Sequence, residues 1–269
     1  MHKNKEMKKI IGIVLISLFA LLFLCQYYYN RWKPLWSLEE PREMYTINHY
    51  QDDTLRIVMI GDSWIGMRTD SLNNLFQSIL SAKTGRPVIV KTKGKGGEKS
   101  RGIYQLLFEE GGFGTKPLLL SGADYCIIFA GINDAAANLG IKQYNYYMKL
   151  ILVFLLANNV HPILTEIPDV NIWNVYSEKP IKDLVSDYLR SLMTGCGMYH
   201  FSDYRKALQS MLKDSRLIDS VLYVPMRGWN GDNSDMNKHL FLDDQIHLNQ
   251  GGYIKMDSCI IEAICRDLK

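Results

Sequence analysis

The chain has 269 residues, of which 47% are apolar and 22% charged, proportions typical of a folded globular protein and unlike those of a disordered one. Its formal net charge of +3 is small and the basic residues are scattered, so the composition does not indicate a nucleic-acid partner. The five cysteines show neither metal-ligand spacing nor a Cys-x-x-Cys pair, and no cofactor-binding motif is found.

The N-terminus has the pattern of a membrane segment. Residues 1–9 contain four lysines, and residues 10–30 contain an unbroken apolar run from Ile10 to Cys25 followed by three tyrosines. Lysines mark the cytoplasmic side of a span and tyrosines its interface. We therefore expect a signal anchor over residues 10–30, a cytoplasmic end at residues 1–9 and an exported remainder. The alternative is a cleaved signal peptide, although no small-x-small cleavage site follows the run.

Residues 31–54 are predicted to be a polar tether, because Pro34 and Pro41 disfavour a long helix. From residue 55 to 269, short apolar strands alternate with helices, which implies a parallel sheet covered on both faces. The expected strands are 56–60, 87–91, 124–130, 162–166 and 198–201, and the expected helices are 65–83, 98–110, 142–158, 180–194, 203–213 and 251–266. One long irregular region, about 215–250, has the length of a functional or disordered loop.

Gly61-Asp62-Ser63 is the first candidate functional segment. It ends the first apolar strand abruptly, and an amphipathic helix follows at once. Such a turn holds the Ser63 hydroxyl at the carboxyl edge of the sheet, where open α/β folds bind their ligands, and the helix N-terminus favours negative charge beside it. Ser63 is thus a candidate nucleophile. The alternative is that Asp62 and Ser63 only cap the helix.

Asp244-Gln245-Ile246-His247, shortly before the last predicted helix, is the second candidate segment. A serine hydroxyl needs a base to take its proton, and histidine suits that role near neutral pH. The histidine in turn needs a carboxylate that fixes its tautomer and orientation. Asp244 can supply that carboxylate, with the adjacent Asp243 as the alternative. Considered alone, the segment would also fit an ordinary surface loop.

Two further segments offer donors for an oxyanion hole, which needs hydrogen-bond donors aimed where negative charge develops. Asn133, in Gly131-Ile132-Asn133-Asp134, directly follows the strand at 124–130 and is expected at the same edge as Ser63. Gly94-Lys95-Gly96-Gly97 follows the strand at 87–91, so a glycine amide can face the site without an intervening side chain. A helix cap and an ordinary turn are the alternatives for each segment alone.

Together, and in this order along the chain, these segments resemble the four sequence blocks of the SGNH, or GDSL, hydrolases. The blocks are Gly61-Asp62-Ser63, Gly97, Gly131-x-Asn133-Asp134 and Asp244-x-x-His247. The resemblance covers about residues 55–267 and implies a three-layer α/β/α, flavodoxin-like fold with a five-stranded parallel sheet. This agrees with the five strands expected from the pattern.

The resemblance also implies roles for the residues of the blocks. Ser63 would be the nucleophile, His247 the base and Asp244 its orienting acid, while the backbone amides of Ser63 and Gly97 and the side chain of Asn133 would form the oxyanion hole. Gly96 fits the second block as well as Gly97 does. Trp64 stands where many members of the family have a smaller aliphatic residue, so we expect it to narrow the acyl pocket.

The implied chemistry is acyl transfer from an ester through a serine-bound intermediate, which needs neither cofactor nor metal. Family members act on lipids, aryl esters and acetylated sugars, and some transfer the acyl group to a sugar hydroxyl. Export of the domain favours a carbohydrate substrate, as do the loop aromatics Trp173, Tyr176 and Trp229. Trp64, Trp173 and Trp229 are the candidate substrate-binding residues.

We therefore predict a membrane-anchored, extracytoplasmic serine esterase that removes O-acetyl groups from cell-surface carbohydrate. One alternative is an O-acetyltransferase that uses the same triad on polysaccharide. The other is a non-catalytic binding or assembly protein that keeps the fold.

Overall fold

The computed structural model describes residues 2–170, 179–226 and 238–269, with side chains from residue 5. The chain forms two units, Met1–Glu39 and Glu40–Lys269. The first is built from one helix, α1 (His2–Trp36). Its portion Lys5–Trp36, with a mean hydropathy of 2.5 in its most apolar window, is long and apolar enough to cross a membrane, as a signal sequence also is.

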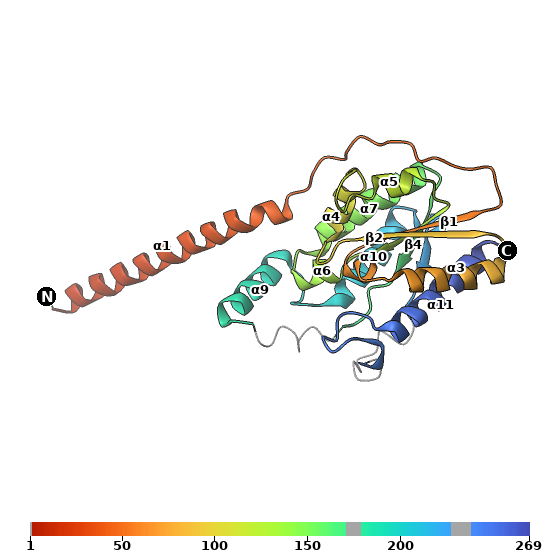
Figure 1. Cartoon of the computed structure of the whole chain (residues 1–269). Helices are drawn as coiled ribbons and strands as arrows, with labels where there is room; N and C mark the ends of the chain where they lie inside the picture. The colour runs from red at the N-terminus through yellow and green to blue at the C-terminus, as the bar shows by residue number, and fades with distance from the viewer. Residues whose placement is uncertain (1, 171–178, 227–237) are drawn as a thin grey trace. The chain divides into compact units, whose positions relative to one another are not determined.

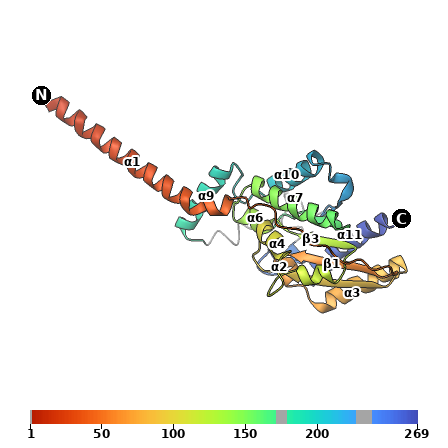
Figure 2. The ribbon, with the colours of Figure 1, turned by 90° about the horizontal axis from the view of Figure 1, so that it is seen from above.

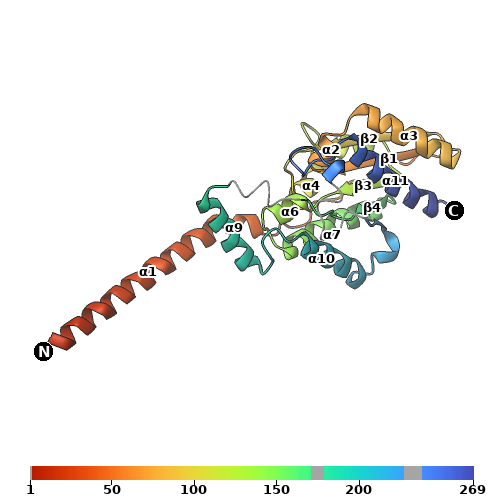
Figure 3. The ribbon, with the colours of Figure 1, turned by 90° about the horizontal axis from the view of Figure 1, so that it is seen from below.

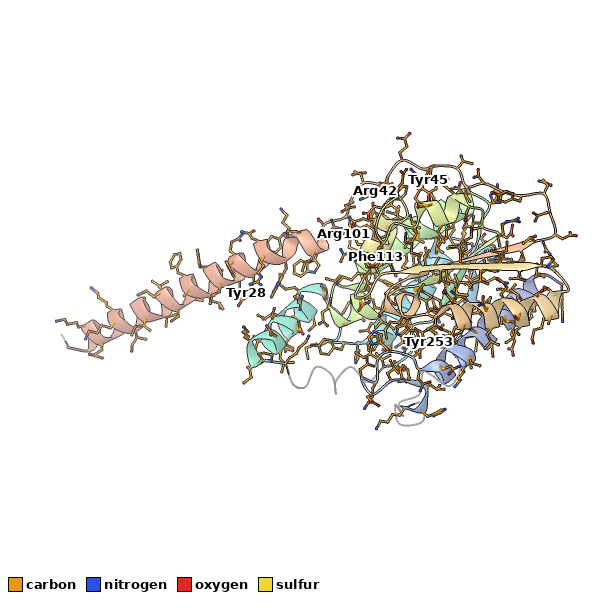
Figure 4. The ribbon with its side chains drawn as sticks, viewed as in Figure 1. Tyr28, Arg42, Tyr45, Arg101, Phe113 and Tyr253 are labelled. Atoms are coloured by element: carbon orange, nitrogen blue, oxygen red, sulfur yellow. The ribbon has the colours of Figure 1, made fainter. Side chains whose placement is uncertain are left out.

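Helix α1 continues six residues past residue 30, where the predicted anchor ended. Pro34 lies inside its last turn, where a proline removes one backbone hydrogen bond. The carbonyl groups at this end of a helix lack helical partners in any case. Tyr28 stacks on Trp32 with ring centroids 5.0 Å apart, which adds an aromatic contact along this part of the helix (Figure 4). The predicted tether is therefore helical at its start.

The second unit is built on a five-stranded parallel sheet in the order β2-β1-β3-β4-β5 (Figure 1). The strands are β1 (Leu55–Gly61), β2 (Val88–Gly94), β3 (Tyr125–Phe129), β4 (His161–Thr165) and β5 (Leu222–Val224). The central strands β1 and β3 are almost entirely buried, as expected for continuous apolar runs in a parallel sheet that helices cover on both faces.

Helices cover both faces of this sheet (Figures 2 and 3). One layer contains α3 (Asp70–Thr84) and α11 (Gln250–Asp267), and the other contains α4 (Ser100–Leu106), α5 (Lys116–Leu120), α7 (Ile141–Ala157) and α10 (Phe201–Asp214). The remaining described helices are α2 (Ser63–Gly66), α6 (Ile132–Ala136), α9 (Ile181–Thr194) and the 3₁₀ turn η1 (Ile218–Ser220). The predicted three-layer α/β/α fold is confirmed.

The fifth strand lies elsewhere than predicted. Instead of forming a strand, residues 198–201 form a turn in which Tyr199 has a φ of +58°, and Phe201 begins α10. A left-handed residue cannot continue an extended strand, and the backbone N–H of Tyr199 donates to Asn138 Oδ1 instead of to a neighbouring strand. The true fifth strand is the three-residue β5, which pairs with β4 and lies within the region expected to be irregular.

The predicted helix 65–83 is two helices, α2 and α3, with a break at residues 67–69. At the break, Arg68 turns its side chain inward and forms a two-pronged ion pair with Asp257 of α11, with N–O distances of 2.8 and 2.7 Å. The Arg68 side chain is fully buried and that of Asp257 is 5% exposed. This pair attaches α11 to the chain that follows Ser63.

Residues 40–54, predicted as the end of a tether, belong to the second unit instead and are bonded to its helical layer, and we name them the N-terminal strap. The backbone N–H of Ile47, a side chain only 2% exposed, donates to Asn158 Oδ1 at 2.8 Å. Tyr45 Oη donates to the carbonyl of Leu107 at 2.7 Å, and Arg42 N–H donates to Tyr104 Oη at 2.8 Å (Figure 4). Only residues 37–39 then connect α1 to the strap.

Candidate active site

Ser63 begins helix α2 directly after strand β1 and Asp62. The buried Asp62 carboxylate accepts a hydrogen bond from the backbone N–H of Trp64 at 3.0 Å, which is the N-cap that the sequence offered as an alternative. Because the side chain of Asp62 makes this cap, the Ser63 hydroxyl is not used for capping. Within the described ranges, the backbone N–H of Ser63 has no hydrogen-bond partner, so it can donate to a bound group.

Ser63, His247 and Asp244 lie in one hydrogen-bonded chain. His247 Nε2 is 2.9 Å from Ser63 Oγ, and His247 Nδ1 is 2.6 Å from Asp244 Oδ2. The first distance is typical of a hydrogen bond, and the second is short, in the direction expected for a bond to a carboxylate. In this geometry the imidazole can take the hydroxyl proton of Ser63 while the carboxylate of Asp244 holds the ring and stabilises the imidazolium that forms.

A tight turn brings the Asp244 carboxylate next to the His247 ring. Asp244 Oδ1 accepts the backbone N–H groups of Ile246 and His247, each at 2.9 Å, and Gln245 between them has a φ of +56°. Burial acts to raise the pKa of Asp244, but the hydrogen bonds from the His247 ring and these two amides outweigh it and lower the pKa below its usual range. The carboxylate therefore stays ionised beside the histidine.

Hydrogen bonds of the residues before and after His247 also hold its segment in place. Phe241 and Leu248 form an antiparallel bridge, and Leu242 N–H donates to the carbonyl of His247 at 2.7 Å. Asn249 follows as the N-cap of α11, where its side chain accepts the N–H of Gly252 at 3.0 Å. These local bonds fix the position of His247 against α11.

Asn133 joins the other two candidate segments. Its side-chain amide donates to the carbonyl of Glu98 at 2.9 Å and to Asp62 Oδ2 at 3.3 Å, so it connects the loop after β2 with the turn after β1. In that loop Gly97 has a φ of +72°, a conformation that favours glycine, whereas Gly96 does not have a positive φ. Which of the two amides faces Ser63 stays a prediction. No described residue accepts the Gly97 N–H.

Two buried carboxylates beside these segments were given no catalytic role from the sequence. Asp134, which is fully buried, accepts the hydroxyl of Ser100 at 2.5 Å and its backbone N–H at 2.9 Å, and so attaches the start of α4 to α6. Burial raises the pKa of Asp134, and it raises that of Asp62 to about 7 with a smaller contribution from Asp134. The sequence signal for both is an acidic residue shortly after the end of a buried apolar strand.

Trp64 connects the helix of Ser63 to the segment of His247. The side chain is 2% exposed, and its indole N–H donates to the carbonyl of Ile246 at 3.1 Å. Tyr253 of α11 donates its hydroxyl to the carbonyl of Trp64 at 2.8 Å (Figure 4). Trp64 also lines a cavity of about 10 Å³ with Asp62 and residues that follow β3 and β4. Its role in the acyl pocket stays a prediction, and the predicted substrate contacts Trp173 and Trp229 lie outside the described residues.

The fold and these distances define the class of the protein: an α/β domain with serine, histidine and aspartate aligned at the carboxyl edge of a parallel sheet. Residues 59–254, more than half of the chain, match the family model of GDSL-like lipases and acylhydrolases. The protein therefore belongs to the GDSL-like lipase/acylhydrolase family, as the sequence blocks predicted. No protein with a curated description matches the chain.

Solved structures similar to this chain include a lipase/acylhydrolase from Enterococcus faecalis, with a TM-score of 0.56 and 16% identity over 79% of this chain and 96% of that one. An acetyl xylan esterase has a TM-score of 0.57 and 15% identity over 78% and 100%. A mutant of an acetyl-xylooligosaccharide esterase from Geobacillus has a TM-score of 0.55 and 14% identity over 78% and 94%. At these identities, the similarity establishes the fold.

Proposed function

We propose that the protein is a membrane-anchored, extracytoplasmic serine esterase that removes O-acetyl groups from cell-surface carbohydrate. The observation that carries the proposal is the hydrogen-bonded chain from Ser63 Oγ through both nitrogens of His247 to Asp244, with distances of 2.9 and 2.6 Å. Membership of a family of ester hydrolases supports the same reaction.

The reaction proceeds in two halves. His247 Nε2 takes the proton from Ser63 Oγ as the oxygen attacks the ester carbonyl, and the resulting oxyanion is held by the N–H groups of Ser63 and Gly97. The Asn133 amide joins them when it exchanges its longer bond, 3.3 Å to Asp62 Oδ2, for one to the oxyanion. The imidazolium of His247 then protonates the leaving sugar oxygen, which leaves an acyl group on Ser63. A water molecule, deprotonated by His247, releases the acid and restores the serine.

The similar structures support an acetyl group on a carbohydrate. Two of the structural neighbours are esterases of acetylated xylan or xylo-oligosaccharide. The four lysines at the N-terminal end of α1 support an orientation with the domain outside the cytoplasm.

The first test is hydrolysis of 4-nitrophenyl acetate by the full chain in detergent. Ser63→Ala should lower kcat by at least about 10³-fold while the protein stays folded, because no other hydroxyl lies on His247 Nε2 in the described part of the chain. Ser78→Ala, on the surface of α3, is the matched control and should be unchanged. Full activity of Ser63→Ala would contradict the proposed nucleophile.

The second test uses an acetylated xylo-oligosaccharide together with an unacetylated one. Release of free acetate that depends on Ser63 supports the esterase. Acetyl groups that appear on the unacetylated sugar, with little free acetate, would assign the O-acetyltransferase reaction to the same triad. A folded chain that is inert toward both the aryl ester and the sugar ester would support the non-catalytic alternative.

A further inference from the structure

Helix α9 exposes a row of apolar side chains, while the two residues that it buries are polar. Its apolar stripe, which we define as Ile181, Val185, Tyr188 and Leu192, follows helical spacings of four, three and four residues, and these side chains are 80, 50, 55 and 60% exposed. On the opposite side, Asp187 and Ser191 are only 2 and 4% exposed. A helix on a water-exposed surface ordinarily has the reverse arrangement.

Hydrogen bonds hold α9 in this orientation. The carboxylate of Asp187 accepts from Lys179 Nζ at 2.8 Å, from the hydroxyl of Tyr199 and from the guanidinium of Arg190. Burial acts to raise the pKa of Asp187, but these three partners outweigh it and keep the pKa below its usual range. Turning the helix to bury the apolar stripe would expose Asp187 and break its bonds to Lys179 and Tyr199, so the described part of the domain leaves the stripe uncovered.

The length of the connection between the two units indicates which partner is at hand. Only residues 37–39 separate the end of α1 from the start of the second unit. Three residues span about 10 Å when fully extended. If α1 spans a membrane, the domain is therefore always held at the surface of that membrane. Aliphatic side chains with a tyrosine are also typical of helices that lie in a lipid interface.

We infer that the apolar stripe of α9 lies in the lipid interface of the membrane that α1 crosses, as a second attachment of the domain. The inference rests on the anchor that is part of the proposed function. It does not depend on the esterase reaction, because no residue of the stripe belongs to the triad or to the oxyanion hole.

Photo-crosslinking of the full chain in phosphatidylcholine and phosphatidylglycerol vesicles tests the inference. A benzophenone amino acid is placed at position 188 in the stripe, at position 19 in α1, and at position 75 on α3, where Leu75 is 38% exposed outside any stripe. Mass spectrometry then counts lipid adducts. We expect adducts at positions 188 and 19, with at least fivefold fewer at position 75.

Each outcome decides a different point. Adducts at position 19 without adducts at position 188 would overturn the inference and keep the anchor. No lipid adducts at either position would overturn both. Crosslinks from position 188 to a second copy of the chain would assign the stripe to a dimer instead of to lipid. A chain that forms the adducts but hydrolyses no ester would keep this inference and contradict the proposed esterase.

A substitution in the stripe provides the second readout. Leu192→Asp, in the chain labelled at position 188, should lower the yield of lipid adducts at least fivefold, because a carboxylate resists entry into the lipid interface. Hydrolysis of 4-nitrophenyl acetate should stay within twofold of the parent chain. Leu75→Asp on α3 is the matched control and should leave the yield unchanged. An unchanged yield with Leu192→Asp would overturn the inference.

Discussion

At the scale of single residues, the orientation of His247 depends on a carboxylate three positions earlier in the same turn. Asp244→Asn keeps the size of the side chain but removes the charge and favours the wrong imidazole tautomer, so kcat should fall by about 10³- to 10⁴-fold. Asp243→Asn is the matched control, because the His247 ring is bonded to Asp244, and it should stay within about threefold. A mild effect at Asp244 with a severe one at Asp243 would move the role to the neighbour.

The raised pKa of Asp62 predicts that the free energy of unfolding depends on pH. Its pKa is raised to about 7 by burial, against about 3.9 in an unfolded chain. Between these two values the native state holds a proton that the unfolded state has released, so Asp62 makes the free energy of unfolding decrease as the pH rises, until the effect levels off above pH 7. Asp62→Asn keeps an acceptor for Trp64 and cannot ionise.

The variant should therefore gain stability relative to the parent chain between pH 5 and pH 8, by on the order of 1–3 kcal/mol. Chemical unfolding of both full chains in detergent at the two pH values measures this change. The comparison isolates Asp62 from Asp134 and Asp257, whose pKa values burial also raises. A difference in stability that is the same at both pH values would show that Asp62 does not titrate there.

The meeting of Ser63, His247 and Asp244 could be predicted from the sequence, while the roles assigned to them stay predictions. Ser63, Asn133 and the glycine loop each follow a parallel strand, and parallel strands bring their carboxyl ends to one edge, so their proximity follows from topology. The turn of Asp244 and His247 is local and could also be predicted. The bond between Asp134 and Ser100 could not, because it joins two segments 34 residues apart through side chains that only the packed structure brings together.

At the scale of elements, the closest contact near Ser63 is between the end of β2 and α2. A Cβ at Gly94 would lie 2.4 Å from Gly66 N and 2.5 Å from Asp62 O, which are backbone atoms that cannot rotate away. Gly94→Ala should therefore displace α2 and move Ser63 from His247, and a misplacement of about 1 Å lowers kcat on the order of 10²-fold.

Gly96→Ala is the matched control for this prediction, because a Cβ there meets no atom within 4 Å. Its rate of 4-nitrophenyl acetate hydrolysis should stay within about twofold of the parent chain. The two variants are compared by kcat together with the melting temperature. Equal activity of Gly94→Ala and Gly96→Ala would show that the contact between β2 and α2 does not position the serine.

The wrongly predicted fifth strand shows where pattern analysis loses information. Residues 198–201 have more apolar character than a loop needs, but their side chains pack around a left-handed turn at Tyr199 instead of in a sheet. The real strand β5 has three residues, which is too short for a periodicity to be recognised. The break between α2 and α3 could not be predicted for a different reason. Arg68 at the break pairs with Asp257, which is far away in the sequence.

At the scale of the whole molecule, the N-terminal strap predicts where the folded domain begins. Ile47 is 2% exposed, so its removal loses about 1.5–3 kcal/mol of hydrophobic stabilisation, and the hydrogen bonds of Arg42, Tyr45 and Ile47 are lost as well. A loss of about 3 kcal/mol lowers the melting temperature of a domain of this size by about 6–12 °C.

A chain that begins at residue 55 should therefore melt at a temperature lower by this amount than a chain that begins at residue 40. Ile47→Ala in the longer chain should reproduce part of the decrease, whereas Glu43→Ala, at an exposed position of the strap, should not. Thermal unfolding followed by circular dichroism measures all four proteins. Equal melting temperatures for the two chain lengths would show that the strap adds nothing to the fold.

The strap has a mechanical consequence for an anchored enzyme. If α1 anchors the chain and the domain binds a long polymer, as proposed, tension between the polymer and the anchor enters the domain through residues 40–47. Because Arg42, Tyr45 and Ile47 are bonded to Tyr104, Leu107 and Asn158, the load passes into α4, the residue that follows it and the end of α7. These three hydrogen bonds lie between the anchor and β1, the strand that leads to Ser63, so they are loaded before that strand is.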